Sequence, residues 1–80
     1  MKPIPIETLE TEDDILFYVI RVNTRSDDPY EPDEFVKSGC YCKVIMKIDN
    51  TITKTYYFKN GEQTSKEKII QDERIKSLRR

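Results

Sequence analysis

The chain contains no histidine, no tryptophan and no alanine. Histidine is the side chain that ordinarily titrates near neutral pH, so its absence excludes serine–histidine–aspartate catalysis, cysteine–histidine catalysis and histidine-based metal sites. We therefore expect a protein that is not an enzyme and uses no cofactor. A composition rich in Ile, Lys, Glu and Thr but without Ala is typical of an AT-rich genome, and it favours a low-GC bacterium or one of its phages or mobile elements.

Cysteine and long apolar runs are also scarce. Cys40 and Cys42 are too few for the disulfide framework of a short secreted protein, and no second pair completes the four ligands of a structural zinc site within one chain. We expect both thiols to be free, buried and without metal, although a site shared across a dimer stays open. The apolar run 15–20 is far shorter than the ~20 residues of a membrane-spanning helix, which predicts a soluble, cytoplasmic protein.

What the chain does contain is enough for a single small domain. Its 80 residues include ten isoleucines and eight aromatic residues beside 36% charged residues. Residues 1–14 carry two prolines and five acidic residues, which indicates an extended acidic arm. Residues 15–22 are β-branched and aromatic and predict a strand. Both faces of that strand are apolar, so the arm, a partner or a second copy of the chain should cover the face that a helix leaves open.

Two further strands are predicted at 40–48 and 51–59, joined by a tight turn into a hairpin. An odd number of residues in the loop would place Cys42 opposite Phe58 and give a coherent apolar face. That loop would require a left-handed residue near Thr51, where a β-branched side chain is poorly suited. The pattern thus favours the odd loop and the turn chemistry opposes it, a conflict that a bulge elsewhere would settle.

The C-terminal segment predicts a helix over 65–79, because Thr64 and Glu67 match a capping box. Its apolar stripe consists of Ile70, Ile75 and Leu78, with Ile69 at the margin. An alternative breaks the segment into strands at 67–71 and 74–78, giving an SH3-like or Tudor-like small barrel. The fold predicted first is α+β: a small antiparallel sheet of about three strands with the C-terminal helix packed on it.

Charge divides the chain more sharply than the net value of −1 suggests. Residues 1–40 carry a net −6 and residues 41–80 a net +5. The two halves could pair their charges within the domain. Beyond that, the long acidic loop 24–39 interleaves carboxylates with aromatic side chains, a combination suited to a basic protein surface. The predicted partner-binding residues of this acidic–aromatic segment, 27–35, are Asp27, Asp28, Tyr30, Glu31, Asp33, Glu34 and Phe35.

The basic half supports an alternative in which the protein binds nucleic acid. The bases that would contact phosphates are Lys66, Lys68, Arg74, Lys76, Arg79 and Arg80. Against this alternative, the pI of 5.4 is far from the basic value typical of such domains. We therefore predict first a non-enzymatic protein-binding module, an inhibitor or regulator from a phage or mobile element that occupies a basic surface of a host protein. Self-association is also expected if a second copy covers the first strand.

Overall fold

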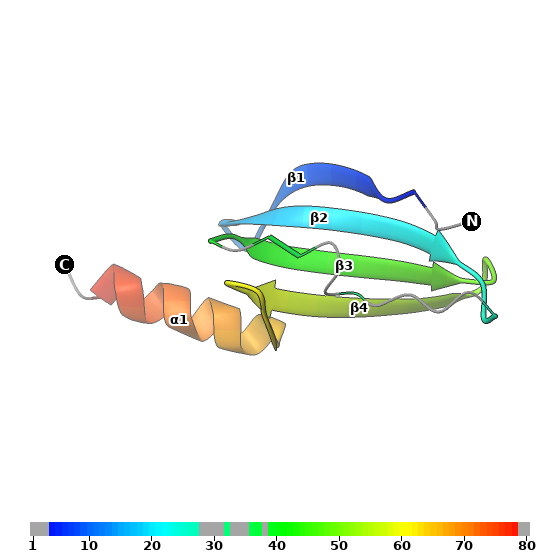
Figure 1. Cartoon of the computed structure of the whole chain (residues 1–80). Coiled ribbons are helices and arrows are strands. Elements are labelled where there is room, and N and C mark those ends of the chain that lie inside the picture. The colour runs from blue at the N-terminus through cyan, green and yellow to red at the C-terminus, as the bar shows by residue number, and fades with distance from the viewer. Residues whose placement is uncertain (1–3, 28–31, 33–35, 38, 79–80) are drawn as a thin grey trace.

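The computed structural model describes residues 4–27, 32, 36–37 and 39–78. Its elements are the strands β1 (Ile6–Glu12), β2 (Ile15–Thr24), β3 (Tyr41–Ile48), β4 (Ile52–Lys59) and β5 (Glu62–Thr64), followed by the helix α1 (Lys66–Leu78). The strands form one open sheet in the order β1-β2-β3-β4-β5, with the helix at one end (Figure 1). The α+β class is confirmed, and α1 occupies the segment for which the alternative expected two strands.

The sheet differs from the prediction in size and in direction. It has five strands instead of about three, because the acidic arm supplies β1 as an edge strand and the chain after β4 turns back as β5. It is also mixed, since β2 and β3 run parallel whereas every other neighbouring pair is antiparallel. Parallel strands need a crossover of a dozen or more residues, and the long acidic loop provides that length.

Three tight turns join the antiparallel strands, and each has positive φ at both central residues. These pairs are Asp13–Asp14, Asp49–Asn50 and Asn60–Gly61. Type I′ hairpin turns require this backbone, and Asp, Asn and Gly adopt it more readily than other residues. The turns therefore follow directly from local sequence.

The β3–β4 register confirms the odd loop. Cys42 lies opposite Phe58, as the apolar pattern predicts. The left-handed residues are Asp49 and Asn50, while Thr51 is an additional residue whose N–H donates to the carbonyl of Ile48 at 3.1 Å. The conflict between pattern and turn chemistry disappears because a bulge at Thr51 adds the third loop residue without a left-handed β-branched side chain.

The core lies on both faces of the sheet, as the doubly apolar β2 predicts. The crossover face buries Ile20, Val22, Cys42, Val44, Met46 and Phe58, and Val36 from the β2–β3 connection packs against them. The helix face buries Ile15, Phe17 and Val19 against Ile69 of α1. Described residues of the chain thus pack on both faces, Ile69 of α1 on one and Val36 on the other, while the arm lies beside β2 within the sheet.

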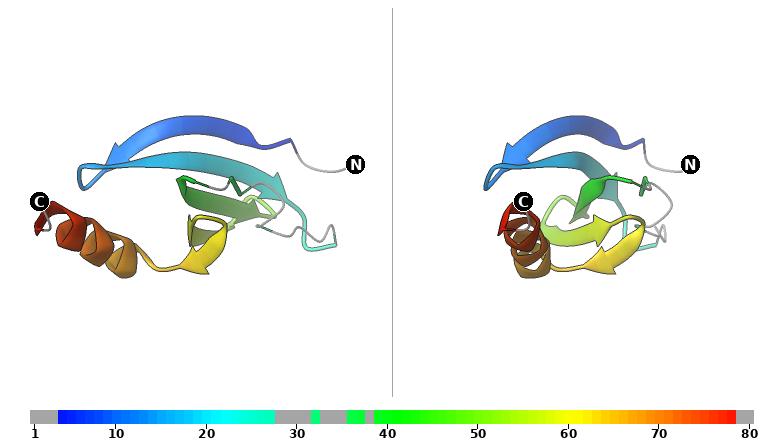
Figure 2. Two further views of the ribbon diagram at one scale, coloured as in Figure 1. Left: turned by 60° about the vertical axis from the view of Figure 1, so that its left-hand side comes forward. Right: turned by 90° about the vertical axis from the view of Figure 1, so that its left-hand side faces the viewer.

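The helix makes its apolar contacts with the sheet through its first two turns. Ile69 is 0% exposed and Ile70 packs against the same cluster, whereas Ile75 is 43% and Leu78 85% exposed, so the predicted stripe is wrong beyond Ile70. Figure 2 shows the reason: α1 begins beside β5 and then runs on beyond the strands. The predicted cap is also displaced by one residue, because the Ser65 hydroxyl, not Thr64, accepts the hydrogen bond from the N–H of Lys68 at 3.3 Å.

Candidate protein-binding surface

The acidic–aromatic segment belongs to the connection between β2 and β3. Asp27 is exposed at its start. The other predicted contact residues, Asp28, Tyr30, Glu31, Asp33, Glu34 and Phe35, lie outside the described residues. The structure does define how the chain on either side of them is attached to the sheet, and this determines where the segment begins and ends.

The β3–β4 turn holds the chain that precedes the segment. The N–H of Asp49 donates to the carbonyl of Thr24 at 2.9 Å, at the last residue of β2. The Asp49 carboxylate in turn accepts a hydrogen bond from the N–H of Ser26 at 3.4 Å. Two links to one turn residue therefore fix the direction in which the chain leaves the sheet toward Asp27.

Side chains of the crossover face hold the chain that follows the segment. Val36 packs in the core cluster, and the Lys37 ammonium lies 4.4 Å from the centroid of the Tyr18 ring, a cation–π contact. The Lys37 carbonyl accepts a hydrogen bond from the thiol of buried Cys42 at 3.7 Å. The Tyr18 hydroxyl donates to the Glu7 carboxylate at 2.5 Å, which links this attachment to β1.

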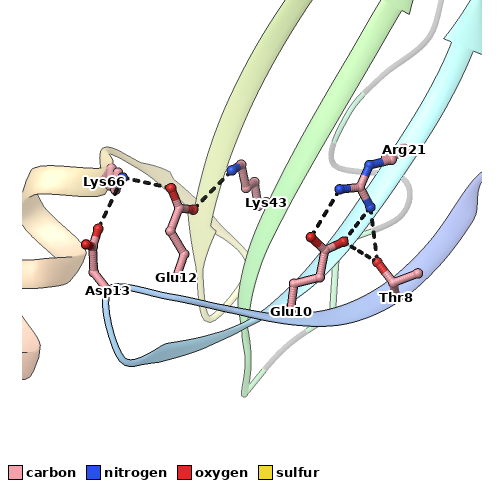
Figure 3. Close-up of polar contacts among 7 residues, drawn as sticks. All are labelled: Thr8, Glu10, Glu12, Asp13, Arg21, Lys43 and Lys66. Atoms are coloured by element: carbon pink, nitrogen blue, oxygen red, sulfur yellow. Dashed lines mark hydrogen bonds and ion pairs between the residues drawn. The ribbon is translucent and has the colours of Figure 1, made fainter.

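The arm's carboxylates pair with bases from other elements (Figure 3). The Glu12 carboxylate lies 3.0 Å from the Lys43 ammonium and 2.7 Å from that of Lys66, which also contacts Asp13 at 3.2 Å. Hydrogen bonds from Lys66 and Lys43 lower the pKa of Glu12. The predicted pairing of the two charged halves is therefore realised where the turn after β1 meets the start of α1.

A second ion pair, between Glu10 and Arg21, joins β1 to β2. Both Glu10 carboxylate oxygens accept hydrogen bonds from the Arg21 guanidinium, at 2.5 and 3.1 Å, and the Thr8 hydroxyl donates to one of them at 2.6 Å. The hydrogen bonds from Arg21, followed by that from Thr8, lower the pKa of Glu10 to about 2. The acidic arm is thus bound to its own chain.

The bases predicted for nucleic-acid binding are only partly available. Lys66 is engaged by Glu12 and Asp13, and its pKa is raised by the hydrogen bonds to them. Lys76 lies 3.7 Å from the Glu73 carboxylate and 5.8 Å from the Tyr41 ring centroid. The side chains of Lys68 and Arg74 are exposed, and Arg79 and Arg80 lie outside the described residues.

Sequence reasoning missed the contacts that α1 makes with polar side chains of the sheet. The Tyr41 hydroxyl donates to the Glu73 carboxylate. The Lys59 ammonium lies 2.6 Å from the Asp72 carboxylate. Burial, with a smaller effect from Glu73, raises the pKa of Tyr41 to about 12. The available signal was the strand alternation, which places Tyr41 and Lys59 on one face, the face that α1 covers.

A shallow groove, also missed, lies between the β1–β2 turn and α1, with a volume of about 530 Å³. Its lining is Asp13, Asp14, Ile15, Ile70, Glu73 and Arg74. No local motif marks it, because it forms only where the turn meets the helix. Three carboxylates and one guanidinium make up its charged lining, beside two isoleucines.

The two cysteines are free but differ in environment. Cys42 is buried, as predicted, whereas Cys40 is exposed because it precedes β3 and lies outside the core of the crossover face. Burial raises the pKa of the Cys42 thiol. Among the residues that the structure describes, no cluster of cysteine and carboxylate side chains is arranged to hold a metal ion.

No protein-family model, no curated protein and no solved structure matches this chain. Within the described part of the chain, no helix is long and apolar enough to cross a membrane.

Proposed function

We propose that the protein is a non-enzymatic protein-binding module that occupies a basic surface of another protein through the acidic–aromatic segment. In this proposal it is a cytoplasmic inhibitor or regulator from a phage or mobile element, and its partner is a host protein. Carboxylates next to Tyr30 and Phe35 would supply charge complementarity and aromatic anchors together.

The observation that carries the proposal is the engagement of the arm's carboxylates by bases of the same chain. Three carboxylates of the acidic arm, residues 1–14, form ion pairs with bases of the same chain: Glu10 with Arg21, Glu12 with Lys43 and Lys66, and Asp13 with Lys66. The acidic arm therefore has a structural role, because these ion pairs join β1 to the rest of the domain. We assign partner binding to the acidic–aromatic segment. Apart from Glu7 and Asp14, it contains every acidic residue of the first 40 that is not in these ion pairs.

The attachments on either side of the segment add a second argument. Asp49 holds the chain before it, and the contacts of Val36 and Lys37 hold the chain after it. Fixing both ends of a binding segment reduces the conformational entropy that is lost when it meets a partner. The sheet would thus act as a scaffold from which the segment binds.

The test is affinity purification of the tagged full chain from a low-GC bacterial lysate at physiological salt, with and without nuclease, followed by mass spectrometry. A stoichiometric protein partner that survives nuclease supports the proposal. Material that is lost on nuclease treatment, together with binding of purified nucleic acid that weakens steeply as salt rises, contradicts it and supports the nucleic-acid alternative.

A further inference from the structure

Strand β1 forms one border of the sheet, and within the described residues no strand lies beyond it (Figure 1). Glu12 and Ile15 flank a two-residue turn and form a hydrogen-bonded pair, and such pairs alternate along an antiparallel ladder. Glu7, Leu9 and Thr11 therefore direct their backbone N–H and C=O groups away from β2. An edge of this kind is a template for another strand.

The side chains along this edge include exposed apolar groups on one face. Leu9 is 66% exposed, and Leu16, which pairs with Thr11 from the neighbouring strand β2, is 59% exposed. Both lie on the crossover face, because Leu9 pairs with Tyr18 of that face and successive even positions of β2 share it. The edge thus combines outward-directed backbone groups with the exposed Leu9 side chain, which a second strand would contact.

We infer that β1 pairs with β1 of a second copy of this chain, antiparallel and centred on Leu9, to form a continuous sheet across a symmetric dimer. In this register Leu9 faces Leu9 of the second copy. The remaining cross-strand pairs are Glu7 with Thr11, Thr8 with Glu10, and Ile6 with Glu12. No glutamate faces another glutamate directly.

Repulsion between two acidic strands is the main force against this dimer, and the ion pairs of the arm reduce it. Arg21 engages Glu10, and Lys43 and Lys66 engage Glu12, within each copy. Glu7, the remaining acid of β1, would face the uncharged Thr11 of the second copy. The charge pattern of β1 is therefore compatible with a second β1, and the two-fold axis repeats each favourable pair.

The register predicts that charges of opposite sign at position 11 change the dimer dissociation constant in opposite directions. Sedimentation of the full chain over a range of concentrations measures that constant. Thr11→Lys would place a lysine opposite Glu7 of the second copy twice per dimer, and it should tighten dimerisation by about fivefold. Thr11→Glu would place two glutamates opposite each other twice and should weaken dimerisation by about fivefold. Thr53→Lys and Thr53→Glu are the matched controls, because Thr53 is exposed on β4, which β2 and β3 separate from β1.

The expected result is a concentration-dependent dimer that responds in opposite directions to the two Thr11 substitutions and does not respond to the Thr53 controls. A wild-type chain that stays monomeric up to a few hundred micromolar overturns the inference. So does a dimer whose dissociation constant is insensitive to both Thr11 variants, since its interface then lies elsewhere. Circular dichroism of each variant confirms that the fold is retained.

Discussion

Replacing Ile69 by alanine tests how α1 is attached to the sheet. Ile69 is fully buried against Ile15, Phe17 and Val19, and it is the buried apolar side chain that the helix contributes to this cluster. Deleting its three outer carbon atoms costs about 2.4 kcal/mol at roughly 0.8 kcal/mol for each buried methylene. The cavity left behind raises the expected loss to about 3 kcal/mol, within the range of roughly 2–5 kcal/mol for such core substitutions.

That loss is large for this chain. At roughly 0.05–0.15 kcal/mol per residue, a domain of 80 residues has a free energy of unfolding of about 4–12 kcal/mol. With a urea dependence near 1 kcal/mol per molar for a small domain, the unfolding midpoint should fall by about 2–3 M. Because the chain lacks tryptophan, far-UV circular dichroism and tyrosine fluorescence are the appropriate probes.

Ile75→Ala is the matched control, since it makes the same chemical change in the same helix at a side chain that is 43% exposed. Its loss should stay below about 1 kcal/mol, because little burial is removed and alanine has the higher helix propensity. The reasoning is refuted if Ile69→Ala costs less than about 1 kcal/mol, or if the two substitutions cost the same.

Three further outcomes follow from the polar contacts and the thiols. Stability should fall as pH drops from about 4.5 toward about 2, because the lowered pKa of Glu10 stabilises the folded state above the pKa of the unfolded chain, and this stabilisation is lost on protonation. In Glu10→Gln the decline of the urea midpoint over that window should be shallower, and an unchanged decline would show that the Arg21 contact contributes nothing. Tyr41 should ionise near pH 12, so ultraviolet titration of Tyr41→Phe should lose a component near that pH; an unchanged absorbance change near pH 12 would contradict its burial. A thiol reagent should modify one cysteine rapidly in the folded chain, and Cys40→Ser should abolish that fast phase, whereas a fast phase that survives would show that buried Cys42 is accessible.

Features encoded by local sequence could be predicted from the sequence. The run of β-branched and aromatic residues in β2, the alternation in β3 and the C-terminal helix each depend on neighbouring residues and are confirmed. The odd β3–β4 register was also favoured by the apolar pattern. A bulge was expected away from Thr51, and its position at Thr51 escaped prediction, because it combines a left-handed pair at Asp49–Asn50 with one additional residue.

Features that depend on contacts distant in sequence could not be predicted. The parallel pairing of β2 with β3 is set by where the crossover returns, and hydrophobic alternation is the same for either strand direction. The exposed end of α1 depends on the helix running beyond the sheet, so Ile75 and Leu78 were assigned a core that they do not meet, whereas Ile70 does pack against it. The ion pairs of Glu12 with Lys43 and Lys66 join three elements, and only the overall division of charge indicated them.

The central claim is that the acidic–aromatic segment binds a basic protein surface, and one affinity comparison tests it most directly. The variant carries Glu31→Gln, Asp33→Asn and Glu34→Gln, and the control carries Glu62→Gln, Glu67→Gln and Asp14→Asn, which removes the same charge at exposed sites. Affinity for the purified partner should fall about tenfold or more in the first variant and change little in the control. Equal affinity of the two variants would contradict the claim.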